Sequence, residues 1–280
     1  MIRAVIRGGG DLGSGIALRL WRCGFEVVVL EAAAPVAVRR TVAFAEAVYE
    51  GAQRVEEARG VLAAEDDVES LIAAGDIPVL VDPATVSLSA LHPAVLIDAT
   101  MAKRNLGTRS DMAPITVAVG PGFHAPEDAH AVVETQRGPH LGRVVWEGGA
   151  ERNTGVPGAV AGRGVERVLR APAQGVFSVQ REIGDIVAAG DVVARVAGEP
   201  IEAPFPGLVR GLLRPDTLVS AGMKVGDLDP RLDPSLAFLV SDKALAVAGG
   251  VLEAILSLSG GRRRDDATRR PSGRELQAEQ

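Results

Sequence analysis

The residues best suited to bind a charged group lie in a glycine-rich turn near the start of the chain. The turn consists of Gly8, Gly9, Gly10, Asp11, Leu12 and Gly13. Its glycines follow the spacing G-x-G-x-x-G, in which the chain leaves a strand by a tight turn and main-chain N–H groups at the start of a helix face a phosphate. Glu31 stands 18 residues after Gly13, close to where an acidic side chain binds the ribose hydroxyls of a dinucleotide. The pattern predicts phosphate or nucleotide binding; the alternative is a loop that only turns the chain.

Asp11 is the residue of this turn that a simple NAD-binding interpretation does not explain. A carboxylate at this position repels a bound pyrophosphate unless it points away or accepts a hydrogen bond elsewhere. The turn therefore predicts an anion site without deciding which nucleotide-bearing ligand it takes.

Two later loops carry further candidate residues. Asp98 and Lys103 follow one expected strand, and Gly120 and Gly122 follow another. Open parallel sheets bind ligands outside the carboxyl ends of their strands. We therefore expect both loops to face the glycine turn.

A polar stretch at 124–143 holds three of the four histidines of the chain. Within it, His130 and Glu134 share one face on either a strand or a helix, and Arg137 follows closely. A neutral imidazole and a carboxylate can bind a divalent metal or act as an acid–base pair, but an exposed ion pair explains them equally. The spacing matches no known metal motif, so we predict no metal site and retain His130, Glu134 and Arg137 as ligand-contacting candidates.

Three other side chains that could be reactive are expected to have structural rather than functional roles. Arg39 and Arg40 are expected on a solvated helix face. Cys23 lies one residue before the expected end of the first helix at Gly24, and we expect it to be a small buried hydrophobe. Nucleophilic chemistry by this thiol is therefore not expected.

The elements that position these residues alternate between strand and helix. A helical pattern follows the glycine turn, and the apolar run 27–30 is typical of a strand buried on both faces. Further strands are expected at 79–81, 95–98 and 115–119, with a helix at 67–74. The fold class predicted for residues 1–160 is α/β, a Rossmann-like nucleotide-binding domain with a parallel sheet.

The second half of the chain contains an internal repeat with an offset of 32 residues. Ala171, Pro172 and Gly175 align with Ala203, Pro204 and Gly207. The pattern A-P-x-x-G followed by G-D-x-V-x-x-G resembles the barrel-sandwich hybrid of lipoyl and biotin carriers, and predicts a small all-β domain at 165–230. In those carriers the modified lysine lies between the two halves, here 196–200, which contain no lysine. Lys224 falls late in the second half, so we expect no biotin or lipoate attachment.

The remaining segments are assigned by composition. The glycine-rich stretch 147–163 reads as a connection between the domains. Ser241 is a suitable N-cap for an apolar C-terminal helix at 240–259, and the polar segment 260–280 is expected to be a disordered tail.

Composition excludes several classes of protein. A net charge of -6 and an aromatic content of 3% argue against nucleic acid as a partner. No run approaches the roughly 20 apolar residues that span a bilayer, so no membrane association is expected. The start of the chain reads as a buried strand rather than a signal peptide, and the expected location is cytoplasmic.

Several longer motifs together resemble one protein family. They are G-G-G-D-L-x-S-G near the start, R-R-x-V-A-F-x-E-A-V-Y-x-G from Arg39, V-x-V-G-P-G-F from Val117, A-V-V-E-T-x-R-G from Ala131, L-G-R-V from Leu141 and A-G-M-K-V-G-D-x-D-P-R from Ala221. This pattern is similar to the YqeB-type proteins of the selenium-dependent molybdenum hydroxylase system. The resemblance implies a role like that of the XdhC-like factors, with Gly8, Gly10, Asp11 and Gly13 on the phosphate of a nucleotide or pterin dinucleotide. It implies a ligand-facing position for Gly120, Gly122, Glu134 and Arg137.

The leading functional hypothesis is accordingly an accessory protein that matures a molybdenum hydroxylase. It would bind molybdenum cofactor dinucleotide or an NAD-like ligand, with little or no catalysis, and would dock the hydroxylase apoenzyme or another maturation protein. The alternatives are an NAD(P)-dependent oxidoreductase, with His130 or Lys103 as proton donor, and a non-catalytic ligand sensor or adaptor. Homo-oligomerisation is left open.

Overall fold

The computed structural model describes residues 1–152, 158 and 160–260, so the predicted tail beyond Gly260 lies outside the described residues. The first unit is built on a nine-stranded sheet in the order β3-β4-β5-β2-β1-β6-β7-β8-β9. Its strands are β1 Arg3–Arg7, β2 Glu26–Glu31, β3 Ala52–Val55, β4 Ala58–Leu62, β5 Ile77–Val81, β6 Val95–Asp98, β7 Ile115–Val119, β8 Ala131–Val133 and β9 Val144–Val145. Strands β4 to β8 pair in parallel, whereas β3 and β9 run antiparallel at the two edges.

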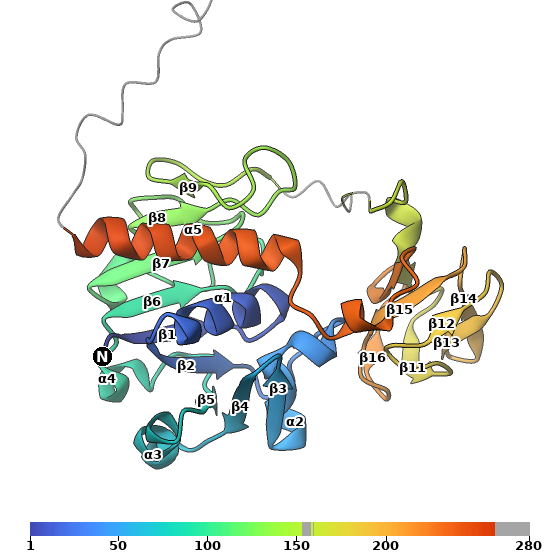
Figure 1. The fold of residues 1–280 in the computed structure, drawn as a ribbon, viewed down its shortest axis with the longest axis horizontal. Helices are drawn as coiled ribbons and strands as arrows, with labels where there is room; N and C mark the ends of the chain where they lie inside the picture. Colours follow the sequence, from blue (N-terminus) through green and yellow to red (C-terminus); the bar gives the residue numbers. More distant parts are fainter. Residues whose placement is uncertain (153–157, 159, 261–280) are drawn as a thin grey trace, which may run out of the picture.

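Helices cover both faces of this sheet (Figure 1). The helices are α1 Asp11–Arg22, α2 Ala47–Glu50, α3 Val68–Ala73, α4 Leu88–Leu91 and α5 Asp242–Ser259, with 3-10 turns at Arg40–Val42, Phe44–Glu46, Glu65–Asp67, Ser110–Met112, Val165–Arg167 and Pro234–Ala237. Because side chains alternate along β1, Ala4 and Ile6 pack towards α1 and α5, and Val5 packs towards α3 and α4. The central strands are therefore buried on both faces.

The second unit consists of two four-stranded antiparallel sheets, in the orders β10-β17-β15-β12 and β14-β13-β11-β16. Its strands are β10 Val168–Arg170, β11 Gly175–Val179, β12 Ile186–Val187, β13 Val192–Val196, β14 Glu199–Glu202, β15 Gly207–Leu212, β16 Leu218–Val219 and β17 Lys224–Asp229. The strands β11, β12 and β13 begin 32 residues before β15, β16 and β17. The halves exchange one strand each, since β12 pairs with β15 and β16 pairs with β11. Phe177, Val193 and Val209 lie in the shared core.

The predicted fold class, a Rossmann-like parallel sheet joined to a barrel-sandwich hybrid, is wrong. The large sheet is mixed, because the β3–β4 hairpin and β9 add antiparallel edges. The second unit forms two separate sheets rather than one defined barrel. The edge strands escaped prediction because they are short and lack a two-residue apolar alternation: β3 reads Ala-Gln-Arg-Val and β9 has two residues.

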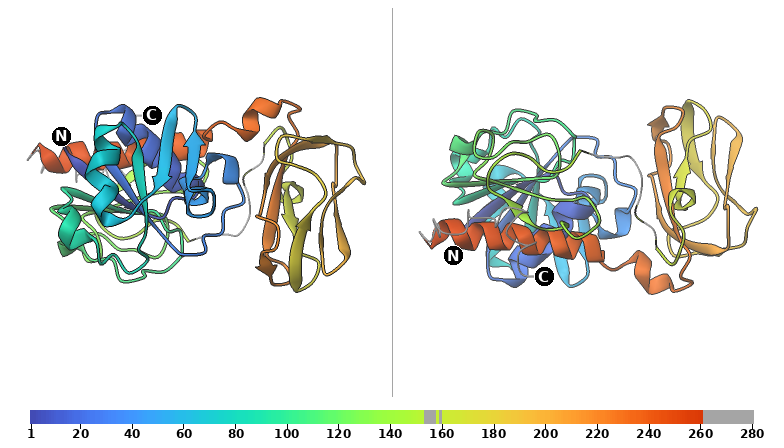
Figure 2. Two further views of the ribbon diagram at one scale, coloured as in Figure 1. Left: turned by 90° about the horizontal axis from the view of Figure 1, so that it is seen from below. Right: turned by 90° about the horizontal axis from the view of Figure 1, so that it is seen from above.

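The C-terminal helix α5 belongs to the first unit, so the second unit lies in the chain between β9 and α5 (Figures 1 and 2). Ser241 is the N-cap of α5, as the sequence indicates, and its hydroxyl accepts a hydrogen bond from the Ala244 N–H at 3.1 Å. Helix α5 packs closely on α1. A Cβ built at Gly15 of α1 would lie only 2.7 Å from the Ala244 Cβ of α5. The apolar surface of α5 thus covers one face of the large sheet.

Candidate functional site

Three glycines of the turn between β1 and α1 are required by the protein's own packing. Gly8 has φ +97°, and a Cβ there would lie 2.9 Å from the Thr100 Cα. A Cβ at Gly9 would lie 2.9 Å from Val29 Cγ1, and a Cβ at Gly13 would lie 1.9 Å from the Gly8 carbonyl oxygen. These glycines allow α1 to approach the sheet closely.

Gly10 differs from the other three. Its φ of -70° and ψ of -171° are open to any residue, and a Cβ at this position would meet no atom within 4 Å. Gly10 borders a cavity. Neither backbone conformation nor packing requires glycine here, and what its lack of a side chain provides is close access from the cavity to the main chain.

The main chain exposed in this way carries unpaired donors. The N–H groups of residues 10–13 have no acceptor among the described residues, and the first helical bond runs from the Ser14 N–H to the Gly10 carbonyl at 2.8 Å. No side chain caps α1. The N-terminus of α1 therefore presents several N–H donors and the positive end of the helix dipole at one place.

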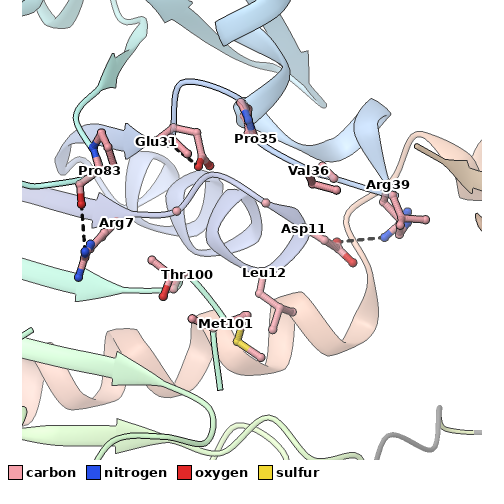
Figure 3. Close-up of a pocket in the computed structure, with 18 of the residues that line it drawn as sticks. Arg7, Asp11, Leu12, Glu31, Pro35, Val36, Arg39, Pro83, Thr100 and Met101 are labelled. Carbon is pink, nitrogen blue, oxygen red and sulfur yellow. Dashed lines mark hydrogen bonds and ion pairs between the residues drawn. The ribbon is translucent and has the colours of Figure 1, made fainter. Parts of the chain in front are cut away.

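The cavity has a volume of about 550 Å³ and lies between the two units (Figure 3). It is lined by Arg7, Gly8, Gly10, Asp11 and Leu12 from the turn, by Leu30, Glu31, Ala32, Ala34, Pro35, Val36, Ala37, Val38, Arg39 and Ala45, by Pro83, Ala99, Thr100, Met101, Ala102 and Leu106, and by Arg210 and Lys224 from the second unit. The segment after β2 and the loop after β6 thus form its walls, as the carboxyl ends of parallel strands do in open sheets.

Asp11 is paired rather than free, which answers the difficulty raised by the sequence. Arg39 Nη1 lies 3.2 Å from Asp11 Oδ1, and Arg39 Nη2 donates to the carbonyls of Leu236 and Leu239. Arg39 is 5% exposed, and its Nε has no hydrogen-bond acceptor in the structure. Burial lowers the pKa of the Arg39 guanidinium, and the nearby Asp11 opposes this effect. An arginine nonetheless remains a cation, so it offsets the charge of Asp11.

The expectation that Arg39 and Arg40 lie on a solvated helix face is wrong for both residues. Arg39 forms an isolated parallel bridge with Leu212 of the second unit, and Arg40 Nε donates to the Leu212 carbonyl at 2.9 Å. Both side chains therefore help join the units. The reason is that the segment after β2 passes between the units instead of forming a surface helix.

Arg210 and Lys224 bring positive charge from the second unit into the cavity. Arg210 Nη2 lies 2.5 Å from Asp227 Oδ2. The Lys224 ammonium, in contrast, is 3.9 Å from Asp227 Oδ1. Burial lowers the pKa of Lys224; Asp227 opposes that shift and Arg210 adds to it. The position of Lys224 in the repeat argues against biotin or lipoate attachment. The spacing of residues in the sequence does not indicate that Lys224 of β17 lies in the same cavity wall as the glycine turn.

Glu31 lines the cavity but braces the turn. Its Oε2 accepts a hydrogen bond from the Gly9 N–H and its Oε1 accepts one from the Ala32 N–H, each at 2.7 Å. Asp98 is fully buried behind the cavity wall, where it lies 3.4 Å from Arg7 Nη1 and accepts hydrogen bonds from Thr108 and Thr100. Both carboxylates therefore have structural partners, and Glu31 alone of the two faces the cavity.

The other predicted site residues do not line the cavity: Gly9, Gly13, Lys103, Gly120, Gly122, His130, Glu134 and Arg137. Gly122 is packed against the main chain of Arg104. His130 Nδ1 accepts a hydrogen bond from the Thr116 N–H at 3.0 Å. Arg137 forms two bonds of 3.0 Å to Asp242 at the start of α5.

His130 and Glu134 do not form a pair. They flank the short strand β8 at opposite ends, and a strand rises about 3.3 Å per residue, which separates them along its length. Glu134 is 3% exposed and accepts hydrogen bonds of 2.6 Å from the N–H groups of Thr135, Gln136 and Glu151. Glu134 therefore organises the loop after β8.

Within residues 1–152, 158 and 160–260, no group of three or more His, Cys, Asp or Glu side chains is placed to hold a metal ion. Cys23 is exposed at the C-cap of α1, so the expectation of a buried thiol is wrong. It lies at the end of α1 opposite the glycine turn. None of the helices in the described part of the chain is long and apolar enough to cross a membrane.

Comparison with known proteins gives one clear relative. No protein-family model matches the chain. Over 255 residues the chain is 50% identical to a protein of Escherichia coli (strain K12) described as uncharacterized protein YqeB. The match covers 91% of this chain and 47% of that protein, so the chain spans about half the length of the curated relative it matches. The link to a selenium-dependent molybdenum hydroxylase system stays a prediction, as do the proposed partners and the cytoplasmic location.

Three solved structures show weak overall likeness. They are an aspartoacylase family protein from Mesorhizobium loti (14% identity, TM-score 0.26), a succinylglutamate desuccinylase/aspartoacylase from Rhodobacter sphaeroides (14%, 0.24) and the ectoine utilization protein EutE (DoeB) from Ruegeria pomeroyi (12%, 0.25). Each match covers 81% of this chain and 84% of the other. The TM-scores are too low to transfer an activity to this chain.

The names of these matches give no support to the predicted function. They name an aspartoacylase, a desuccinylase and an ectoine utilization protein, and none of the three is a factor for a molybdenum hydroxylase. The predicted maturation factor for a molybdenum hydroxylase is therefore not retained, and the geometry of the cavity is the basis of the proposal below.

Proposed function

We propose that this protein binds a phosphorylated small molecule, with a phosphate group on the N–H donors of residues 10–13. The observation that carries the proposal is the combination of four unpaired main-chain donors with Gly10, whose lack of a side chain no feature of the fold requires. A phosphate oxygen close to Gly10 would account for both. Helix N-termini of this kind are established anion sites.

The surroundings of the turn support a phosphate rather than an uncharged group. Arg39, Arg210 and Lys224 line the same cavity, and Asp11 is already neutralised by Arg39. Phosphate offers several acceptor oxygens, and charge-assisted hydrogen bonds from N–H groups and cations are about twice as strong as neutral ones. The ligand would thus meet donors from both units.

The size of the cavity supports a small molecule. Its volume of about 550 Å³ lies within the range of about 300 to 1,000 Å³ that is typical of small-molecule sites. Leu12, Val36 and Met101 supply apolar wall next to the charged groups (Figure 3). This mixture fits a phosphate attached to an organic body.

The proposal is tested by calorimetric titration of the purified chain with inorganic phosphate, in the wild type and in Gly10→Ala. A methyl group at position 10 leaves the fold intact but occupies the space a phosphate oxygen would use. We expect saturable binding by the wild type and a loss of affinity of about fivefold or more in Gly10→Ala. No saturable binding by the wild type, or equal affinity in both proteins, would overturn the proposal.

A further inference from the structure

Lys224 is the one cation of the cavity wall without a close partner among the described residues. Arg7 bonds Asp98, Thr108 and two carbonyls, and Arg39 bonds Asp11 and two carbonyls. Arg210 bonds Asp227 at 2.7 Å. The Lys224 ammonium lies 3.9 Å from its nearest carboxylate oxygen, beyond hydrogen-bond distance.

Arginines already pair with the carboxylates next to Lys224, and at Asp227 they do so through Oδ2. Asp227 faces Arg210 at 2.5 Å and Arg167 at 3.5 Å, besides Lys224. Asp229 lies 2.7 Å from Arg231. Two carboxylates thus serve four cations, which leaves a local excess of positive charge on this edge of the second unit.

Arg167 is a second cation of this edge that is incompletely paired. Its side chain is 4% exposed, yet its Nη2 is buried without a hydrogen-bond acceptor in the structure. A buried donor left without an acceptor costs free energy. In this cluster the Nη2 of Arg167 thus lacks a hydrogen bond, although Asp227 Oδ2 lies 3.5 Å away.

The positive excess continues across the boundary between the units. Lys243, in the first turn of α5, forms no hydrogen bond or ion pair with the described residues. Burial lowers its pKa most, the charges of Arg137 and Lys224 lower it further, and the charge of Asp11 raises it. Lys243 is therefore a cation of the first unit without an ion pair in the described part of the chain, and it does not line the cavity.

We infer that the ligand carries a second anionic group, which binds Lys224 of the second unit while the first phosphate lies on the N-terminus of α1. This inference rests on the proposed function and names the ligand class: a molecule with two linked phosphates or an equivalent pair of anionic groups. Such a ligand bridges the two units. A compound with one phosphate fills half of the site.

The inference is tested with inorganic phosphate and tripolyphosphate as probes, titrated against the wild type, Lys224→Gln and the control Arg181→Gln. Arg181 is matched to Lys224, because it is a cation of the second unit with a side chain 44% exposed, against 43% for Lys224, and it lies outside the cavity. Circular dichroism of each variant checks that the fold is retained.

We expect the wild type to bind tripolyphosphate at least about tenfold more tightly than phosphate. Lys224→Gln should remove most of that difference, while Arg181→Gln should change the affinity for neither probe. An equal loss of affinity for tripolyphosphate in both variants, or no loss in Lys224→Gln, would overturn the inference of a second anionic group but not the proposed function. Failure of the wild type to bind either probe would instead overturn the proposed function.

Discussion

Asp11 and Arg39 form an ion pair of 3.2 Å in the wall of the cavity, beside the unpaired N–H groups of α1. The pair joins the first turn of α1 to a guanidinium that also holds the carbonyls of Leu236 and Leu239. One arginine therefore neutralises the glycine turn and ties it to the segment that leads from the second unit into α5.

Asp11→Asn should strengthen phosphate binding. The substitution removes a negative charge next to the proposed phosphate and keeps an oxygen that can accept the hydrogen bond from Arg39. We expect the dissociation constant for phosphate to fall roughly fivefold, about 1 kcal/mol. Calorimetry in buffer of low ionic strength measures it, and an unchanged or weaker affinity would place the phosphate away from Asp11.

Arg39→Ala should weaken both the fold and the binding of phosphate. It leaves Asp11 without its partner and two carbonyls without their donor, at a cost of about 2 kcal/mol. Urea unfolding measures this loss. Arg39→Lys should not restore stability, because an ammonium cannot reproduce a planar guanidinium that contacts three groups. Full rescue by lysine would show that charge alone matters at this position.

Two glycines of one turn should respond very differently to substitution by alanine. Gly13→Ala forces a Cβ against the Gly8 carbonyl oxygen and should cost about 2 to 3 kcal/mol. Gly10→Ala creates no contact; the preference of an N-cap for glycine over alanine opposes the restriction of the unfolded chain, so the net change should be less than about 1 kcal/mol. Thermal unfolding of the two variants compares them directly. A loss in Gly10→Ala as large as that in Gly13→Ala would mean that the turn itself needs this glycine.

The bond between Arg137 and Asp242 predicts a loss of stability in acid. Hydrogen bonding to Arg137 lowers the pKa of Asp242 from 3.8 to about 2. A carboxyl group with a lowered pKa in the folded state stabilises above its ordinary pKa and loses that effect as the pH falls towards about 2. Because Asp242 is largely exposed, Asp242→Asn should cost less than about 1 kcal/mol at pH 7. The difference should vanish in urea titrations near the lower pKa, and persistence there would contradict the assignment.

Cys23 should react readily in the folded protein. It is the only cysteine and is exposed at the C-cap of α1, far along the helix from the glycine turn. One thiol should be titrated by a thiol-specific reagent without denaturant, at a rate close to that of the unfolded chain. The labelled protein should bind phosphate like the unlabelled one. Protection of the thiol in the native state would contradict its placement.

The parts of the site that a local pattern encodes could be predicted from the sequence. Gly8 and Gly13 carry the spacing that a turn from strand to helix needs, and the apolar run of β2 follows at the expected distance. Glu31 lies next to the turn, where its carboxylate accepts a hydrogen bond from the Gly9 N–H; its role in binding a ligand stays a prediction. Such features depend on neighbours within about 30 residues.

The residues that complete the cavity depend on long-range packing and could not be found in this way. Arg39 lies in a segment without periodicity, and Lys224 arrives from a unit whose position no local pattern encodes. The prediction that His130 and Glu134 lie on one face was wrong. Their closeness in sequence does not show that they flank a strand at opposite ends. The sequence also does not show which cations are paired. The structure does, because it places Asp227 next to Arg210 and Asp229 next to Arg231.

The central claim is that phosphate binds the free N–H groups at the start of α1. Titration of ¹⁵N-labelled protein with inorganic phosphate, followed by amide NMR, tests it most directly. We predict that the largest saturable shifts fall on the amides of Gly10, Asp11, Leu12 and Gly13. Shifts confined to exposed basic residues elsewhere, with these four amides unmoved, would contradict the account.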